Sequence, residues 1–163
     1  MNRRATTLAV LATLLLGALG AGPVQADGGG RPVRTSDSYT VTFLDDFIVE
    51  TCGIETETTL TESWALLEYP SGKTVLKVKR TFVPADPRIP IEKGHGMTIT
   101  KPDGSRIVIG VPLHLISQLT GRTLIKDTGL VKFDPDGNVV RMVGPHPSLG
   151  IDLTPYYCPG PPD

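Results

Sequence analysis

The chain contains few cysteines, few aromatic residues and few long apolar runs, and each shortage narrows the class of protein. Its 163 residues include two cysteines, one tryptophan and 6% aromatic residues. Two cysteines are too few for a disulfide-dense miniprotein or a four-cysteine zinc site. A formal net charge of -1 lacks the basic excess that is typical of a nucleic-acid binder. The composition therefore favours one globular domain with a core of its own.

The longest apolar run lies at the N-terminus. Arg3 and Arg4 precede an apolar stretch from Leu8 to Leu19, and small residues follow as far as Ala26. This order is typical of a secretory signal peptide, which we place at residues 1–26. The stretch is shorter than the roughly 20 apolar residues that a membrane-spanning helix needs. We expect a secreted, extracellular protein with no membrane span after cleavage.

The two cysteines indicate how the remaining chain is held together. Cys52 and Cys158 are expected to form a disulfide, because an exported chain enters an oxidising compartment. Neither a CxxC motif nor a neighbouring histidine supports a metal pair or a reactive thiol. The cysteines nearly bracket the predicted domain, residues 38–158. A glycine-rich segment, 27–37, is predicted as a flexible linker before it, and a proline-rich tail, 159–163, follows it.

The clearest local signals are three turns of one type. No stretch has apolar residues at helical spacing, whereas alternation with period two recurs. The motifs "YPSGK" (69–73), "KPDGS" (101–105) and "DPDGN" (134–138) each place proline, a polar residue and glycine between strand-like runs. Proline presets the backbone for the first turn position and glycine adopts the left-handed conformation. The motifs therefore predict three β-hairpins with three-residue loops.

Loops of this length also predict which residues face each other across each hairpin. Apolar residues then meet apolar residues, and a glutamate meets an arginine, which supports the turn assignment. The predicted pairs are Leu66 with Leu76, Trp64 with Val78, Glu62 with Arg80, Ile99 with Ile107, Met97 with Ile109, Phe133 with Val139 and Leu130 with Met142.

Further strands are expected between and around the hairpins. The candidate segments are residues 39–44, 47–60, 111–117, 122–126 and 149–153. Together with the hairpins they make about ten short strands. We predict an all-β fold, an antiparallel meander barrel of about 8–10 strands, because consecutive hairpins form meanders; the alternative is a two-sheet β-sandwich.

The motif "DPDGN" resembles the opening of a calcium-binding loop, but the resemblance ends there. An EF-hand loop needs glycine at its sixth position and glutamate at its twelfth. Counted from Asp134, these positions hold Val139 and Pro145. The three histidines are also not spaced as local zinc ligands. The sequence predicts no metal site and no cofactor.

No constellation of catalytic residues stands out. The chain has neither a nucleophile elbow nor a glycine-rich phosphate loop. His114, in "VPLHLIS", and Glu57, in "TCGIETETTL", are the two weak pocket candidates. An exposed histidine and a solvated strand face are the preferred interpretations of these positions. We therefore assign no catalytic residue.

The chain resembles a group of small secreted proteins of unassigned function from high-GC Gram-positive bacteria. The shared features are "TCGIETETTL", "SGKTVLKV", "GMTITKPDGSRIVIG" and "GLVKFDPDGNVVRMVG", together with a cysteine near the C-terminus. The resemblance implies no catalytic residue.

Two functional hypotheses follow. The first is a non-enzymatic secreted β domain that binds a small molecule, such as an apolar ligand, or a cell-surface component. The alternative is a small barrel enzyme, such as an isomerase or cyclase, that uses His114 and Glu57.

Overall fold

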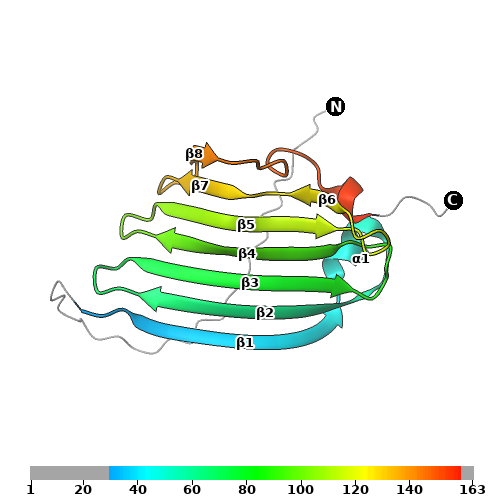
Figure 1. The fold of residues 1–163 in the computed structure, drawn as a ribbon, viewed down its shortest axis with the longest axis horizontal. Coiled ribbons are helices and arrows are strands. Elements are labelled where there is room, and N and C mark those ends of the chain that lie inside the picture. The colour runs from blue at the N-terminus through cyan, green and yellow to red at the C-terminus, as the bar shows by residue number, and fades with distance from the viewer. Residues whose placement is uncertain (1–29, 159–163) are drawn as a thin grey trace.

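A computed structural model describes residues 30–158, and a single antiparallel sheet dominates it (Figure 1). Its eight strands follow the order β1-β2-β3-β4-β5-β7-β8, and β6 pairs with β5. The predicted all-β class is confirmed. The expected signal peptide and the proline-rich tail lie outside the described residues. The strands are β1 (Val33–Leu44), β2 (Glu57–Glu68), β3 (Thr74–Pro84), β4 (Ile91–Thr100), β5 (Arg106–Ile116), β6 (Thr123–Lys126), β7 (Gly129–Phe133) and β8 (Val139–Val143).

The sheet is open, so the structure forms neither the predicted barrel nor the alternative sandwich. β1 forms one edge, β8 and the short β6 form the other, and the two edges do not pair with each other. The turn motifs specify only that neighbouring strands pair, and they do not require the first and last strands to meet. The predicted strand at 111–117 is the continuation of β5, which reduces the number of separate strands.

The hairpins form at the predicted loops. Leu66 faces Leu76, Trp64 faces Val78 and Glu62 faces Arg80, and the second hairpin also has the predicted pairs. The loop glycines at 72, 104 and 137 have φ of 78°, 85° and 89°, the left-handed conformation that the motifs require. In the third hairpin Phe133 faces Val139 as predicted. A register shift beyond that pair places Leu130 opposite Val143 rather than Met142.

The predicted strand at 47–60 is partly wrong, because its first residues form helix α1 (Asp46–Cys52). The Asp45 carboxylate caps this helix by accepting a hydrogen bond of 3.2 Å from the Ile48 amide. Gly53 ends it with φ of 68°. Ile48 is buried, so packing stabilises a helix that is too short to be stable alone.

Two other predicted boundaries also differ from the structure. β1 begins at Val33, so residues 33–37 are strand rather than flexible linker; they pair in register with Glu68 to Trp64 of β2. The predicted strand at 149–153 is absent. Those residues form turns and bends that lead into α2 (Thr154–Tyr157).

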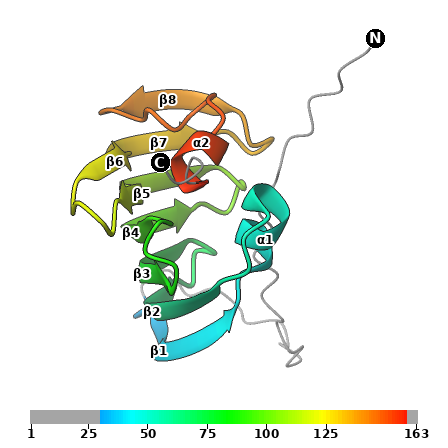
Figure 2. The same cartoon turned by 90° about the vertical axis from the view of Figure 1, so that its right-hand side faces the viewer.

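The core lies at one end of the sheet, where α1 and α2 cover it (Figure 2). The Tyr157 hydroxyl donates a hydrogen bond of 2.5 Å to Glu92 on β4. The Cys52–Cys158 disulfide joins the end of α1 to the residue after α2, with the two Cα atoms 5.2 Å apart. The predicted disulfide is therefore present. The buried core consists of Ile48, Ile89, Leu115, Ile125 and Tyr157.

Both helices lie on the same face of the sheet, which we call the helix-bearing face. Thr58 donates a hydrogen bond of 2.6 Å to Asp45 at the start of α1, and Leu115 belongs to the core beneath the helices. The strand pairings connect these positions to Tyr39, Trp64, Val78 and Arg80 on the same face. Alternate residues lie on the opposite face, which no described helix covers.

Candidate functional site: a cationic sheet face

The face opposite the helices collects nearly all the basic residues of the strands. The registers place Lys79 opposite His95, and Lys93 opposite His114. Within residues 30–158, Glu57 is the only acidic strand residue on this face, whereas Asp37, Glu62, Glu68 and Glu92 lie on the helix-bearing face. We call this surface the cationic face. It comprises Arg34, Lys77, Lys79, Lys93, His95, His114, Lys126, Lys132 and Arg141.

Several of these basic residues lie directly opposite one another. His114 has Lys93 as its partner on β4 and Lys126 as its partner on β6, and Lys132 faces Arg141. Like charges at directly opposite positions destabilise a sheet, by up to about 1 kcal/mol for each pair. In the described part of the chain, the ion pairs are Arg80 with Glu92 and Arg88 with Asp86, so none involves this face. The cationic face therefore carries unbalanced positive charge.

His114 responds to this environment. Burial lowers its pKa below the ordinary value, and Lys126, Lys93 and His95 lower it further because they repel a second positive charge. Its Nε2 atom lies 2.8 Å from the Thr123 hydroxyl. The imidazole therefore reports the local positive potential.

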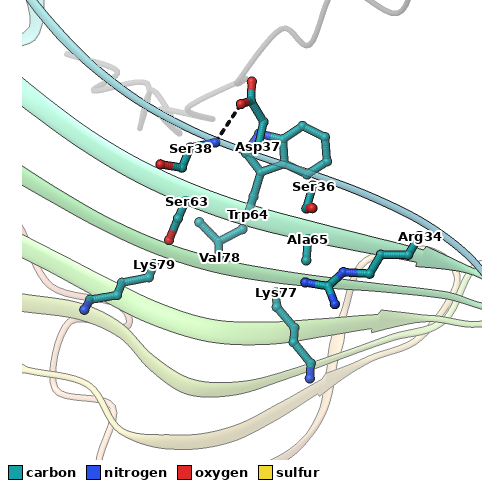
Figure 3. Close-up of a pocket in the computed structure, with 10 residues that line it drawn as sticks. All are labelled: Arg34, Ser36, Asp37, Ser38, Ser63, Trp64, Ala65, Lys77, Val78 and Lys79. Atoms are coloured by element: carbon teal, nitrogen blue, oxygen red, sulfur yellow. Dashed lines mark hydrogen bonds between the residues drawn. The ribbon is translucent and has the colours of Figure 1, made fainter.

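A hollow of about 560 Å³ opens on the cationic face beside β1. Its floor consists of small side chains on β1 and β2, namely Ser36, Ser38, Ser63 and Ala65. Its rim carries Arg34, Lys77 and Lys79. In Figure 3 the Lys77 and Lys79 side chains extend to one side of the sheet, and the Trp64 ring and the Asp37 carboxylate extend to the other. The hollow thus offers cations and hydroxyl groups together.

The hydroxyl-bearing surface continues along β1 and β2. Thr40 and Thr61 are hydrogen-bonded through their hydroxyl groups at 3.3 Å, and Thr42 and Thr59 at 3.0 Å. These side chains are on the same face as the hollow. A linear ligand along β1 would therefore meet hydroxyl groups beyond the hollow itself.

A second hollow lies on the helix-bearing face. It measures about 190 Å³ and is lined by Leu76, Val78, Arg80 and the backbone near Gly94 and Gly96, among other residues. Pockets for small ligands usually measure about 300–1,000 Å³. The apolar hollow is therefore small for a carrier site.

The structure does not bring the two predicted pocket candidates together. His114 lies on β5 and Glu57 at the start of β2, with β3 and β4 between them. Neither residue lines either of the two hollows.

The hairpin loop at Asp134 is held by hydrogen bonds within the loop. Its carboxylate accepts hydrogen bonds from the backbone and side chain of Asn138, at 2.8 and 3.0 Å.

Residues 30–158 contain no cluster of three or more histidine, cysteine, aspartate or glutamate side chains that could bind a metal ion. In the same part of the chain, neither helix has the length and apolar character needed to cross a membrane.

The sequence analysis missed the cationic face. No motif marks this face in the sequence, because its residues come from several strands. The predicted hairpins already placed Lys77 and Lys79 on one face and Glu62 and Arg80 on the other. The β3–β4 pairing, which no hairpin motif specifies, adds Lys93 and His95 to that face.

Family models, curated proteins and solved structures give no match to the chain.

Proposed function

We propose that this protein is an exported, non-enzymatic binding domain whose cationic face binds a linear acidic polysaccharide outside the cell. The disulfide is compatible with an extracellular location. The ligand would supply carboxylate or sulfate groups to the cations and hydroxyl groups to the serine and threonine side chains.

The observation that supports this function best is the gathering of cations on one face: Lys93 and Lys126 flank His114, and Lys132 faces Arg141, with no acidic side chain opposite any of them. A soluble protein gains nothing in stability from such an arrangement. A bound polyanion would relieve the repulsion and would gain charge-assisted hydrogen bonds.

The chemistry of the face favours a polysaccharide over other polyanions. Among residues 30–158, the strand positions on the cationic face include no phenylalanine, tyrosine or tryptophan. Single-stranded nucleic acids are usually held by stacking on aromatic rings, which this face lacks. The hydroxyl-lined floor instead suits a ligand that is rich in hydroxyl groups.

The two earlier hypotheses receive less support. A small apolar ligand would have the hollow of about 190 Å³ on the helix-bearing face, which is undersized. An enzyme of the isomerase or cyclase type would need His114 and Glu57 in one pocket, and two strands separate them.

The first prediction tests the ligand. Heparin and polygalacturonate should bind the purified protein at low salt, as measured by fluorescence polarisation of labelled chains, whereas neutral dextran should not. Lys79→Glu should weaken this binding by about tenfold, because it reverses a charge on the rim of the hollow. Lys101→Glu changes the net charge equally but lies in an exposed hairpin loop, and should have a much smaller effect.

Three results would contradict the proposal. Equal losses from Lys79→Glu and Lys101→Glu would show that only the net charge matters. Tighter binding to single-stranded DNA or to vesicles of anionic phospholipid would assign the face to a different ligand. An absence of binding to both acidic polysaccharides at low salt would exclude the function.

A further inference from the structure

β1 is a long edge of the sheet formed by the described strands. Every one of its 12 residues is exposed, and it pairs with β2 from Val33 to Leu44 without a register shift. No described strand pairs with its other side. Edge strands are usually protected by charged side chains, proline, a bulge or shortness. β1 is long and has neither proline nor a bulge, and its charged residues are Arg34 and Asp37. The other edge, β8, has only 5 residues, contains Arg141 and pairs across a register shift.

We propose that two copies of this chain pair through β1, antiparallel and related by a two-fold axis, to form one continuous sheet. An isologous pairing of this kind is closed, because each copy uses its β1 edge once. The backbone N–H and C=O groups on the outer side of β1 would then gain partners. The dimer does not depend on the proposed function.

The side chains select the register. Side chains that lie opposite each other across the two copies must be on the same face of the sheet. The two-fold axis must therefore pass through a residue, either Ser38 or one of its near neighbours. An axis at Asp37 would place two carboxylates opposite each other, which is unfavourable. An axis at Tyr39 would place Asp37 opposite Val41 of the second copy.

An axis at Ser38 avoids these conflicts. It places Val33 opposite Phe43 of the second copy, and Arg34 opposite Thr42 of the second copy. Asp37 lies opposite Tyr39 of the second copy, an uncharged side chain whose hydroxyl donates a hydrogen bond of 3.0 Å to Glu62 of its own copy. The Val33–Phe43 contact would cover part of the apolar surface that β1 exposes, since these side chains are 64% and 37% exposed in one copy.

This register also joins the two hollows. Ser36 and Ser38 line the hollow beside β1, and in the dimer they adjoin Thr40 and Ser38 of the second copy on the cationic face. The floors then form one hydroxyl-lined trough across the axis. Both copies contribute Arg34, Lys77 and Lys79 to its rim. This extension of the site rests on the proposed function, and it predicts that long acidic chains bind better than short ones.

Charge substitutions at the axis test the dimer. The purified protein should be dimeric by light scattering or sedimentation. Ser38→Asp and Ser38→Lys should each weaken the dimer by about 100-fold, because each places like charges opposite each other. Mixing the two variants should restore a dimer that contains one copy of each. Ser71→Asp and Ser71→Lys, in an exposed hairpin loop, are the controls and should remain dimeric.

A cross-linking measurement does not depend on charge. Facing residues in an antiparallel pair have Cα atoms about 4.5–5.5 Å apart, within reach of a disulfide. Ser38→Cys should therefore form a covalent dimer on mild oxidation. Ser36→Cys should not, because its partner is Thr40 of the second copy.

A wild-type protein that is monomeric at all concentrations would overturn the dimer. So would a Ser38→Asp variant that, on its own, dimerises as strongly as the wild type. Equal cross-linking of the two cysteine variants would overturn the register. A monomer that still binds heparin would refute the dimer and leave the proposed function intact, whereas a dimer that binds no acidic polysaccharide would do the reverse.

Discussion

His114 shows how a single side chain registers the charge of a whole surface. Its facing partners are Lys93 and Lys126, and His95 lies nearby on β4. These groups and burial hold the pKa of His114 below its ordinary value of 6.5. The folded protein therefore resists protonation of this ring more than the unfolded chain does.

The first consequence of this lowered pKa concerns stability. As the pH falls from 6.5 through the lowered pKa of His114, the unfolded chain takes up the proton first, so the free energy of unfolding should decrease. The contribution of this residue is present above pH 6.5 and is lost in that window. His114→Gln should remove that part of the pH dependence in urea unfolding. An unchanged pH profile in this variant would contradict the cause that we assign.

The same residue provides a test of binding. A bound polyanion should raise the pKa of His114, because it neutralises the repulsion from the lysines. The titration of its ring signals by NMR, with and without heparin, measures this shift. An identical titration curve in the presence of bound heparin would place the ligand elsewhere on the molecule.

At the scale of the strand, close backbone approach makes particular glycines necessary. Gly110 on β5 has φ of 131°, and a Cβ atom there would lie 2.5 Å from the carbonyl oxygen of His95. It also faces Gly96 on β4 and Gly129 on β7. The strands can therefore approach at this point only without side chains.

Gly110→Ala should consequently destabilise the fold by more than backbone conformation alone explains. We expect a loss of about 3 kcal/mol, the sum of an unfavourable φ and a steric clash. Gly121→Ala is the matched control, since Gly121 has φ of 70° but nothing within 4 Å of an added Cβ. It should lose only about 1 kcal/mol. Urea unfolding measures both values, and equal losses would exclude the clash.

The hairpins could be predicted because proline and glycine act locally. The residues of "KPDGS" specify the turn, and the turn then specifies that Ile99 faces Ile107. Helix α1 was missed because its stability depends on the burial of Ile48 in a core that forms from distant segments. Its cap residues, Asp45 and Gly53, were nevertheless available as signals in the sequence.

The cationic face was unpredictable for a related reason. Its composition depends on how the eight strands align, and the three hairpin motifs specify only the β2–β3, β4–β5 and β7–β8 pairings. The β1–β2 connection contains α1, and the β3–β4 connection is the segment between Pro84 and Ile91. Only the resulting registers show that most basic residues of the strands lie on one face and most acidic residues on the other.

At the scale of the whole molecule, a single sheet with a small core depends strongly on its cross-link. The two helices lie at the same end of the sheet (Figure 2), and the disulfide and the buried core cluster lie there with them. The disulfide closes a loop with a sequence separation of 106 residues. Closing a loop of this length lowers the entropy of the unfolded chain. It therefore stabilises the folded state by more than a single side-chain contact in the sheet does.

Replacement of both Cys52 and Cys158 by alanine should therefore lower the free energy of unfolding by about 4–5 kcal/mol. Urea unfolding measures the loss, and circular dichroism at zero urea shows whether the strands persist. Replacement by serine is the control for cavity formation. A loss below about 1 kcal/mol would show that the unfolded chain is already compact without the cross-link.

The same covalent loop divides the molecule mechanically. Strands β2 to β8 lie between Cys52 and Cys158, and β1 is the one strand of the described chain outside them. A pulling force applied at the two ends of the chain would pass through β1 and α1 and then across the sulfur–sulfur bond. It would shear β1 from the sheet and leave the remaining strands unloaded. Such a force would thus remove Arg34, Ser36 and Ser38 from the hollow while the basic residues of the other strands stay in the folded sheet.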